Sequence, residues 1–116
     1  MQIDRATRSG VTVLTLTGDA LGGPGGAALH DALHEARGDG PLWAVVDLDG
    51  VRHMNSSGLG MLIGALTTAR NAGGDLRLAN VGDRVRTLLE VTQLADTFQS
   101  FGSADEAVAS FEGMEG

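Results

Sequence analysis

The chain has 116 residues, of which 42% are hydrophobic and 20% are charged, a length and composition typical of one globular domain. Its 15 acidic residues outnumber its 8 basic ones, and the net charge of -7 argues against a surface that binds nucleic-acid phosphates. All the basic residues are arginine and no cysteine is present, which excludes a Schiff-base or phosphate-loop lysine, a disulfide and a zinc-thiolate site.

The sequence carries no sign of membrane insertion or export. No apolar stretch approaches the length of a membrane span, and no basic segment followed by an apolar core opens the chain. We therefore expect a cytoplasmic domain that has neither a membrane nor a nucleic acid as its partner.

The first part of the chain predicts a β-hairpin followed by a helix. Apolar residues and threonines alternate over residues 11–17, which predicts a strand with one buried face. Residues 1–8 are its expected partner strand, joined to it by a tight Ser-Gly turn. Glycines and a proline over residues 22–26 indicate an irregular connection, and apolar residues at helical spacing then predict a helix over residues 27–37.

The middle of the chain predicts a buried strand and a second helix. Residues 42–48 form an apolar run, which is typical of a central strand covered on both faces. Asp49 and Gly50 follow this run and predict a turn. The next helix is expected to begin near Ser56 and to end near Asn71, where a pair of glycines follows.

The last part of the chain predicts shorter elements. Residues 76–79 predict a short strand, and Asp83 is a suitable cap for the helix that follows it. Ser103 and Glu106 have the spacing of a capping box, which predicts a final short helix.

The order of these elements predicts an α/β fold. With a brief extended segment at residues 98–101, strands and helices alternate as they do in βαβ crossovers. We therefore expect a mixed sheet of about four to five strands with about four helices. Residues 1–112 are expected to form a single domain, and residues 113–116 a frayed tail.

The segment that opens the second helix carries the strongest functional signal. Asn55 and Ser56 are both good N-cap residues, so the unpaired backbone N–H groups of the helix are expected near Ser56 and Ser57. A phosphate on Ser57 would lie beside these groups and the positive end of the helix dipole, and the fold would tolerate it. Ser57 is therefore suited to switching association with a partner. The alternative interpretation is a capped helix that packs tightly on its sheet.

Side-chain size divides this helix into two faces. The expected core face consists of Leu59, Leu62, Ile63, Leu66 and Ala69. The other face carries small or soft side chains, namely Ser57, Met61, Gly64 and Thr68. Glycine costs about 0.5 to 1 kcal/mol relative to alanine inside a helix, and this helix contains Gly58, Gly60 and Gly64. The glycines indicate a close approach, either of the helix to the sheet or of a partner to the helix.

The sequence from Asp47 to Leu62, Asp-Leu-Asp-Gly-Val-Arg-His-Met-Asn-Ser-Ser-Gly-Leu-Gly-Met-Leu, resembles the core signature of STAS domains, the fold of bacterial anti-sigma-factor antagonists. In that family a strand ends in Asp-Leu, a short turn leads to Asp-Ser-Ser-Gly or Asp-Ser-Thr-Gly, and Leu-Gly follows in the helix. The resemblance extends over nearly the whole chain, including Gly-Gly-Asp-Leu-Arg-Leu at 73–78 and the Ala-Val-Ala-Ser-Phe ending. It implies a STAS fold and a regulatory binding protein.

The resemblance also implies roles for several residues. Ser57 corresponds to the serine that, in the family, is phosphorylated by an anti-sigma factor that is itself a serine kinase. The unphosphorylated antagonist binds that kinase and frees the sigma factor, and a PP2C-type phosphatase resets the phosphorylated form. Asp47 matches an aspartate at the strand end beside the phosphorylation site, although a turn residue at the strand end is the alternative interpretation. The expected partner-binding residues are Asp47, Asn55, Ser56, Ser57, Gly58, Gly60, Met61 and Gly64.

Two positions depart from the family pattern. Asn55 stands where aspartate is commoner, which removes a charge beside Ser57 but keeps a good N-cap. The usual Gly-Glu-Leu-Asp after the second strand is replaced by Gly-Asp-Ala-Leu-Gly, so Asp19 is a displaced substitute for an aspartate that is often part of the partner surface. Both changes bear on the choice of partner rather than on the fold.

No other motif predicts a catalytic or metal-binding site. His30 and His34 lie four residues apart, but the sequence offers no third ligand, so we expect no metal and no cofactor. Ser57 lacks the Gly-x-Ser-x-Gly pattern of a hydrolase nucleophile and His53 lacks a third group, so we expect no enzyme activity. The alternative functions are a non-phosphorylated STAS scaffold or accessory subunit of a lipid-transport or stress-signalling complex, and a STAS domain that binds a nucleotide or a lipid.

Overall fold

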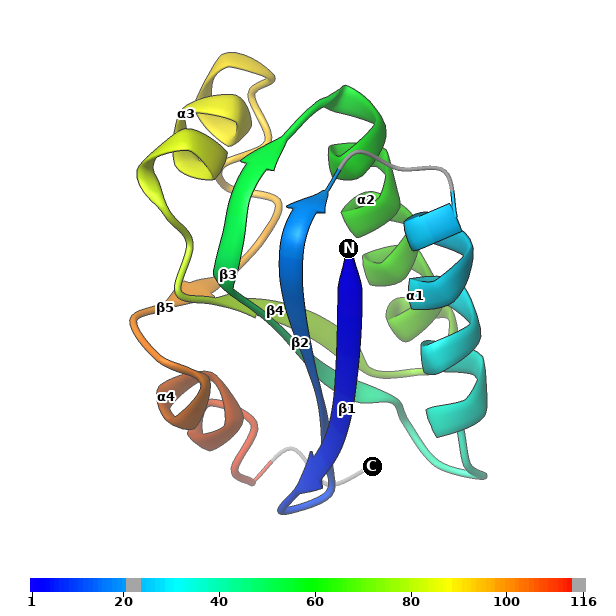
Figure 1. Ribbon diagram of the computed structural model, residues 1–116. Helices are drawn as coiled ribbons and strands as arrows, with labels where there is room; N and C mark the ends of the chain where they lie inside the picture. The colour runs from blue at the N-terminus through cyan, green and yellow to red at the C-terminus, as the bar shows by residue number, and fades with distance from the viewer. Residues whose placement is uncertain (21–23, 114–116) are drawn as a thin grey trace.

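The computed structural model describes residues 1–20 and 24–113, which form a five-stranded mixed sheet with helices on both faces (Figure 1). The strands lie side by side in chain order: β1 (Gln2–Arg8), β2 (Val11–Ala20), β3 (Trp43–Met54), β4 (Asp75–Ala79) and β5 (Ser100–Phe101). β1 is antiparallel to β2, and every other neighbouring pair is parallel. The expected α/β fold is confirmed. The frayed tail expected at 113–116 lies, apart from Gly113, outside the described residues.

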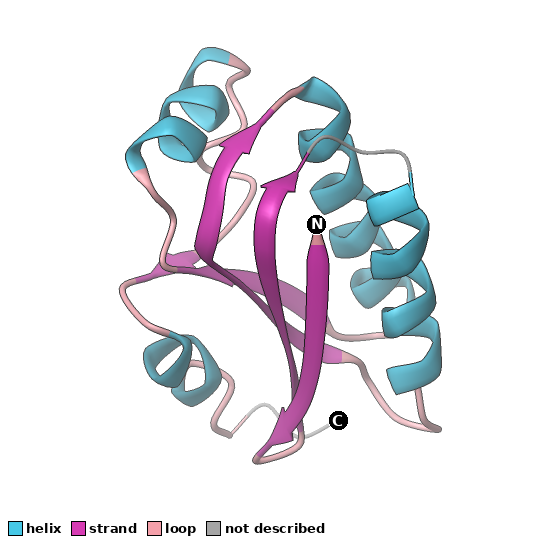
Figure 2. Ribbon diagram, in the orientation of Figure 1, coloured by secondary structure: helices cyan, strands magenta, loops and turns pink. Residues whose placement is uncertain are grey.

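The helices of the described residues are α1 (Pro24–Ala36), α2 (Ser56–Asn71), α3 (Asp83–Val91) and α4 (Ala104–Ala109) (Figure 2). α1 and α2 lie side by side against one face of the sheet, and α3 adds Val85 and Leu89 to the same apolar cluster. Right-handed crossovers between successive neighbouring strands place all three helices on this face. α4 follows the last strand and covers the opposite face.

The opening hairpin is confirmed in detail. Ser9 and Gly10 connect β1 to β2, and their φ angles of 53° and 79° are both positive, as a tight two-residue hairpin turn requires. The turn sets the register in which Arg8 faces Val11. In the strand order of the sheet, β1 is an edge strand and β2 lies inside.

The prediction that residues 11–17 bury only one face is wrong. Leu14 and Leu16 lie in the cluster beneath α1 and α2, whereas Val11 and Val13 lie in a second cluster beneath α4. Both faces of β2 are covered because α4, which lies some ninety residues later in the chain, returns to this strand. Alternation within the strand cannot indicate that contact.

The prediction that the third strand ends at residue 48 is also wrong, because β3 continues to Met54. Asp49 and Gly50 do not form a turn; β3 stays paired with β2 through this region, with two irregularities in the register. A Cβ at Gly50 would lie 2.9 Å from the carbonyl oxygen of Leu16. The glycine therefore permits close approach of two strands in a bulged region, where sequence alone suggested a reversal.

The starts of α1 and α3 differ from the prediction, whereas the start of α4 is confirmed. α1 begins at Pro24 instead of residue 27, since proline is well tolerated in the first turn of a helix. Asp83 is the first residue of α3 and Gly82 is the N-cap, so Asp83 acts on the helix dipole instead of capping the helix. Ser103 caps α4 as predicted, because its hydroxyl accepts a hydrogen bond from the N–H of Glu106 at 3.1 Å. The carboxylate of Glu106 accepts the N–H of Gly102 at 3.0 Å instead of that of Ser103, so the reciprocal bond of the capping box differs from the prediction.

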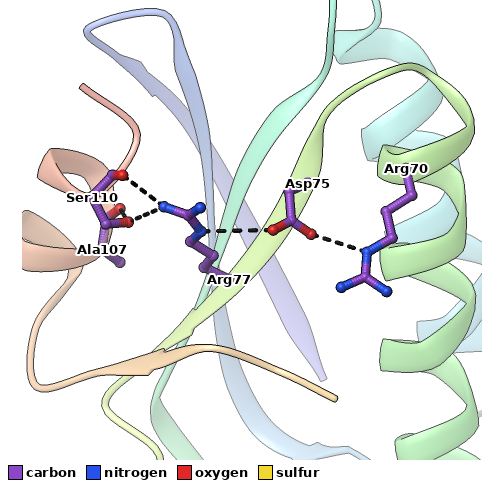
Figure 3. Close-up of polar contacts among 5 residues, drawn as sticks. All are labelled: Arg70, Asp75, Arg77, Ala107 and Ser110. Atoms are coloured by element: carbon purple, nitrogen blue, oxygen red, sulfur yellow. Dashed lines mark hydrogen bonds and ion pairs between the residues drawn. The ribbon is translucent and has the colours of Figure 1, made fainter. Parts of the chain in front are cut away.

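A buried arginine fastens α4 to the sheet (Figure 3). Arg77 on β4 is only 6% exposed, and its Nη1 donates to the carbonyl oxygen and to the hydroxyl of Ser110, both at 2.7 Å. Its guanidinium lies 4.1 Å from the ring centroid of Phe111. Asp75, whose Oδ2 lies 3.7 Å from Nε of Arg77, also accepts a hydrogen bond from Arg70 of α2 at 3.2 Å. These contacts join β4 to helices on both faces.

Candidate functional site

Helix α2 begins at Ser56, as the sequence predicts, and Asn55 is its N-cap. The backbone of Asn55 is extended, and its side-chain oxygen accepts a hydrogen bond from the N–H of Gly58 at 2.8 Å. The carbonyl oxygen of Asn55 accepts the N–H of Leu59 at 2.9 Å. The N–H groups of Ser56 and Ser57 precede these donors and have no acceptor inside the helix. They are the groups available to an anion on Ser57.

Gly58 brings the start of α2 against the sheet. It is buried, and a Cβ there would overlap the carbonyl oxygen of Ala20 at the end of β2. The N–H of Asn55 donates to the same carbonyl at 3.4 Å. The packing of Gly58 on Ala20 holds the first turn of α2 at the carboxyl ends of β2 and β3 (Figure 1). Ser57 lies in this turn and is exposed. Close packing against β2 therefore explains why a glycine occupies position 58. Its role in partner binding stays a prediction.

Gly60 and Gly64 lie in a different setting. Outside the helix itself, a Cβ at either position would meet no heavy atom of the described residues within 4 Å. Close packing on the sheet therefore accounts for Gly58 but not for the other two glycines. The approach of a partner stays the expected reason for them.

A groove of about 280 Å³ lies between α1 and α2. The described residues that line it are Gly26, His30, Ser57, Met61, Gly64 and Ala65. The structure thus brings together Ser57, Met61 and Gly64, which the sequence had placed on one face of the helix. It adds His30, which helical spacing alone could not assign because the sequence does not say which helix packs beside α2.

The prediction that Ile63 belongs to the core face is wrong. Its side chain is 36% exposed, and Ala65, which is 4% exposed, lies in the core instead. The helix packs on the sheet partly through small residues such as Gly58 and Ala65, which a search for large apolar side chains overlooks. Ile63 therefore faces outward on the same side of the helix as Gly60, three residues before it.

Asp47 lies inside β3 rather than at its end. Its Oδ1 accepts hydrogen bonds from Nδ2 of Asn80 at 2.9 Å and from the N–H of Asp49 at 3.0 Å. Met54 lies seven positions beyond Asp47 along the strand, a distance on the order of 20 Å. The interpretation of Asp47 as a strand-end residue is therefore wrong, and the structure does not bring it beside Ser57. Its contribution to partner binding stays a prediction.

The likeness to STAS domains extends over most of the chain. A model of the STAS domain family matches residues 2–107. The chain belongs to the STAS domain family. The segment that resembled the STAS signature forms the junction of β3 and α2, with the capped helix start and Ser57 described above.

Similar proteins include antagonists of anti-sigma factors. An anti-sigma-B factor antagonist of Staphylococcus aureus is 35% identical over 68 residues, and the match spans 59% of this chain and 63% of the relative's length. A solved anti-sigma-factor antagonist (STAS) domain protein from Planctomyces limnophilus has a TM-score of 0.78 at 18% identity, covering 93% of this chain and 96% of its own.

The anti-sigma factor antagonist SpoIIAA also has this STAS fold. Its unphosphorylated form has a TM-score of 0.71 at 20% identity, covering 97% of this chain and 96% of its own. Its phosphorylated form, from Bacillus, has a TM-score of 0.64 at 18% identity, covering 96% of this chain and 98% of its own. At these identities the likeness supports a shared fold.

A polar pair, His53 and Asp19, lies near the carboxyl ends of β3 and β2. Nδ1 of His53 lies 3.1 Å from Oδ1 of Asp19, and each side chain is about half exposed. The sequence offered no partner for His53, because the pairing of β2 with β3 beyond Gly50 depends on the irregular register. Asp19, the displaced substitute in the family pattern, is therefore the neighbour of His53.

The part of this STAS domain that the structure describes contains no cluster of three or more His, Cys, Asp or Glu side chains placed to hold a metal ion. His30 and His34 pack against each other, with ring centroids 4.2 Å apart. Among the described helices, none combines the length and the apolar character needed to cross a membrane.

Proposed function

We propose that this STAS domain is an anti-sigma factor antagonist whose binding to an anti-sigma factor serine kinase is switched by phosphorylation of Ser57. The observation that carries the proposal is the exposed position of Ser57 in the first turn of α2, beside backbone N–H groups without an intrahelical acceptor. The name of the S. aureus relative supports the antagonist role, and the solved phosphorylated form of SpoIIAA supports a phosphate on this fold.

The helix start tolerates the phosphate that the proposal requires. A phosphate on Ser57 adds about -1.5 to -2 charge at the positive end of the α2 dipole, where negative charge is stabilising. Asn55 is neutral, so it caps the helix without repelling that phosphate. The modification therefore changes the surface and leaves the fold intact, and a PP2C-type phosphatase would reverse it.

The proposed partner surface is the outer side of α2 together with the groove beside α1. Gly60 and Gly64 leave that side flat, and Ile63 adds apolar area to it. A partner backbone can approach such a surface closely, so a charge placed on Ser57 would lie within the contact. Burial of an unpaired charge in an interface costs far more than the contact that it displaces.

The proposal is tested by measuring the affinity for an anti-sigma factor kinase from the same organism. Wild type and Ser57→Ala are expected to bind alike, and Ser57→Asp is expected to bind at least tenfold more weakly. Thr87→Asp is the matched control, because it adds the same charge to an exposed position on α3. Equal affinities of the Ser57→Ala and Ser57→Asp variants would contradict the switch.

Intact-mass measurement on protein from its native cells tests the modification itself. We expect a fraction that is 80 Da heavier, roughly the mass of one phosphate, and its loss after Ser57→Ala substitution. The alternative, a scaffold or accessory subunit that is never phosphorylated, predicts a single unmodified mass under every growth condition and with phosphatases inhibited.

A further inference from the structure

The groove beside Ser57 has an unusual distribution of charge. Of the described residues that line it, Gly26, Met61, Gly64 and Ala65 have no ionisable side chain. The imidazole of His30, on α1, is the one ionisable group among those lining residues. It lines the same groove as Ser57, among small and apolar side chains.

The charged neighbours of His30 on α1 face another way. Asp31 and Glu35 line a different depression, between α1 and β1, which also contains Arg5. Nη1 of Arg5 lies 3.5 Å from Glu35, so this pair is satisfied on that flank. Asp4, the other charged residue of this part of β1, does not line the groove either. None of these carboxylates lies among the groove-lining residues.

The charge on α2 is also remote from His30. Arg70 is the single charged residue of the helix, and it lies in the last turn, where it is paired with Asp75. Within the described residues, no side chain that lines the groove can compensate a positive charge on His30 or a negative charge on Ser57, except each for the other.

The other two histidines of the chain have different surroundings. His53 lies 3.1 Å from the carboxylate of Asp19, so a positive charge on it is already compensated. His34 contacts the ring of His30 but does not line the groove. His30 therefore differs from both, because it lines the groove together with Ser57 and no described residue lining the groove carries a carboxylate.

We propose that His30 is a positioning residue for a phosphate on Ser57, holding it across the groove between α1 and α2 as an imidazolium–phosphate pair. The inference rests on the proposed function in taking Ser57 as the phosphate acceptor. A phosphate held in this way is fixed over Met61 and covers the groove. His30 thus couples the phosphorylated state to pH in the range where imidazole titrates.

The sign of the coupling follows from the two charges. Imidazolium loses its charge as pH rises, and phosphoserine gains its second negative charge as pH rises through about 6. Each charge favours the other, so the pair is strongest between the two titrations. The second ionisation of the phosphate is shifted to lower pH, and the titration of the His30 ring is shifted to higher pH by an equal amount, because linkage is reciprocal.

The test uses protein in which phosphoserine is inserted at position 57 during translation, so that it requires no kinase. In ³¹P spectra, we expect the midpoint of the phosphate titration to lie about half a pH unit lower in the parent than in its His30→Gln variant. A shift of this size corresponds to the free energy of an exposed ion pair. The His53→Gln variant is the matched control, since it removes an imidazole that lies beside Asp19 and does not line the groove, and its phosphate should titrate as that of the parent does.

A second measurement needs no variant. The ring signals of the three histidines are followed through a pH titration with and without the phosphate. His30 is expected to show the largest upward shift, and His34 and His53 smaller ones. Equal phosphate midpoints in the parent and the His30→Gln variant, or a response of His30 no larger than that of His34, would overturn the proposal. Loss of kinase binding leaves both readouts unchanged, so failure of the proposed function is distinguishable.

Discussion

The side-chain oxygen of Asn55 accepts the N–H of Gly58 at 2.8 Å, and this contact sets the point at which α2 begins. The same residue donates its own N–H to Ala20 on β2. Asn55 thus connects the helix start to the end of a neighbouring strand. The position of Ser57 relative to the sheet depends on these two bonds.

Replacement of Asn55 tests this cap. Asn55→Ala is expected to lower the free energy of unfolding by about 1 kcal/mol, the usual cost of losing an N-cap side chain. Asn55→Asp retains the acceptor and adds a charge that the helix dipole favours, so its stability should match or exceed that of the parent. Urea denaturation of both variants measures the difference. An unchanged stability of Asn55→Ala would show that the cap contributes nothing.

Alanine at the three helix glycines should give opposite effects on stability. Gly58→Ala forces a Cβ into the carbonyl oxygen of Ala20 and is expected to cost about 2 kcal/mol or more, as overpacking does. Gly60→Ala and Gly64→Ala enter open space and should each stabilise the helix by about 0.5 to 1 kcal/mol.

The same glycine variants test the partner surface. If a partner approaches the outer side of α2 closely, Gly60→Ala and Gly64→Ala should weaken its binding although they stabilise the fold. Thermal denaturation and affinity measurements on the same samples separate the two effects. Stabilised variants that bind as the parent does would remove the reason offered for these two glycines.

Local chemistry explains why some elements could be predicted and others could not. The hairpin turn at Ser9 and the start of α2 at Ser56 depend on neighbouring residues, and both were predicted correctly. The extension of β3 past Gly50 depends on pairing with β2, and the exposure of Ile63 depends on how α2 rotates to pack its small residues on the sheet. Such contacts join residues that are distant in the sequence, so the spacing of apolar residues within one segment cannot predict them.

The candidate site divides in the same way. Ser57 and its cap were found because a short motif specifies them, whereas His30 enters the site through the packing of α1 on α2. Asp47 was assigned to the site from its place in the motif. It lies instead on a strand that continues well beyond it.

The contacts of Arg77 with Ser110 and Phe111 are expected to hold α4 on the sheet. Arg77→Ala removes both hydrogen bonds to Ser110 and the contact with Phe111, and it is expected to cost about 3 kcal/mol, within the range for truncating a buried, hydrogen-bonded side chain. Ser110→Ala leaves the carbonyl acceptor in place and should cost about 1 kcal/mol. Arg70→Ala, in an exposed pair, should change stability by less than about 1 kcal/mol.

Amide hydrogen exchange shows which helix is loosened when the contacts of Arg77 are lost. In Arg77→Ala, the amides of α4 should exchange faster than those of α2, because the variant frees one helix and leaves the other packed. An equal increase of the exchange rates in both helices would indicate global destabilisation. It would contradict the expectation that Arg77 holds α4 in particular.

The pair of Asp47 and Asn80 predicts a structural role for a residue assigned to the partner surface. Asn80 has a φ of 55°, and its side chain donates to Asp47 at 2.9 Å. Asp47→Ala should lower stability by about 1 to 2 kcal/mol, because it leaves the donors of Asn80 and Asp49 without their acceptor. Asn80→Gly loses the bond but relieves the left-handed backbone, so it should cost less than Asn80→Ala.

Binding measurements on the same variant decide between the two roles of Asp47. Because it lies on the order of 20 Å along β3 from the start of α2, we expect Asp47→Ala to change kinase affinity by less than about twofold at a temperature where it stays folded. A tenfold loss of affinity with normal stability would place Asp47 in the interface instead.

Met61 and Ile63 separate packing from binding on α2. Met61 is partly buried against the core and lines the groove, so Met61→Ala should cost about 1 to 2 kcal/mol and also weaken partner binding. Ile63 is exposed, and Ile63→Ser should change stability by no more than about 0.5 kcal/mol while it weakens binding through lost apolar contact. Leu62→Ala, fully buried between them in sequence, is the control for a core position and should cost about 3 kcal/mol. If Ile63→Ser binds the kinase as tightly as the parent, the outer side of α2 is not the contact, and the partner must dock at the groove beside α1.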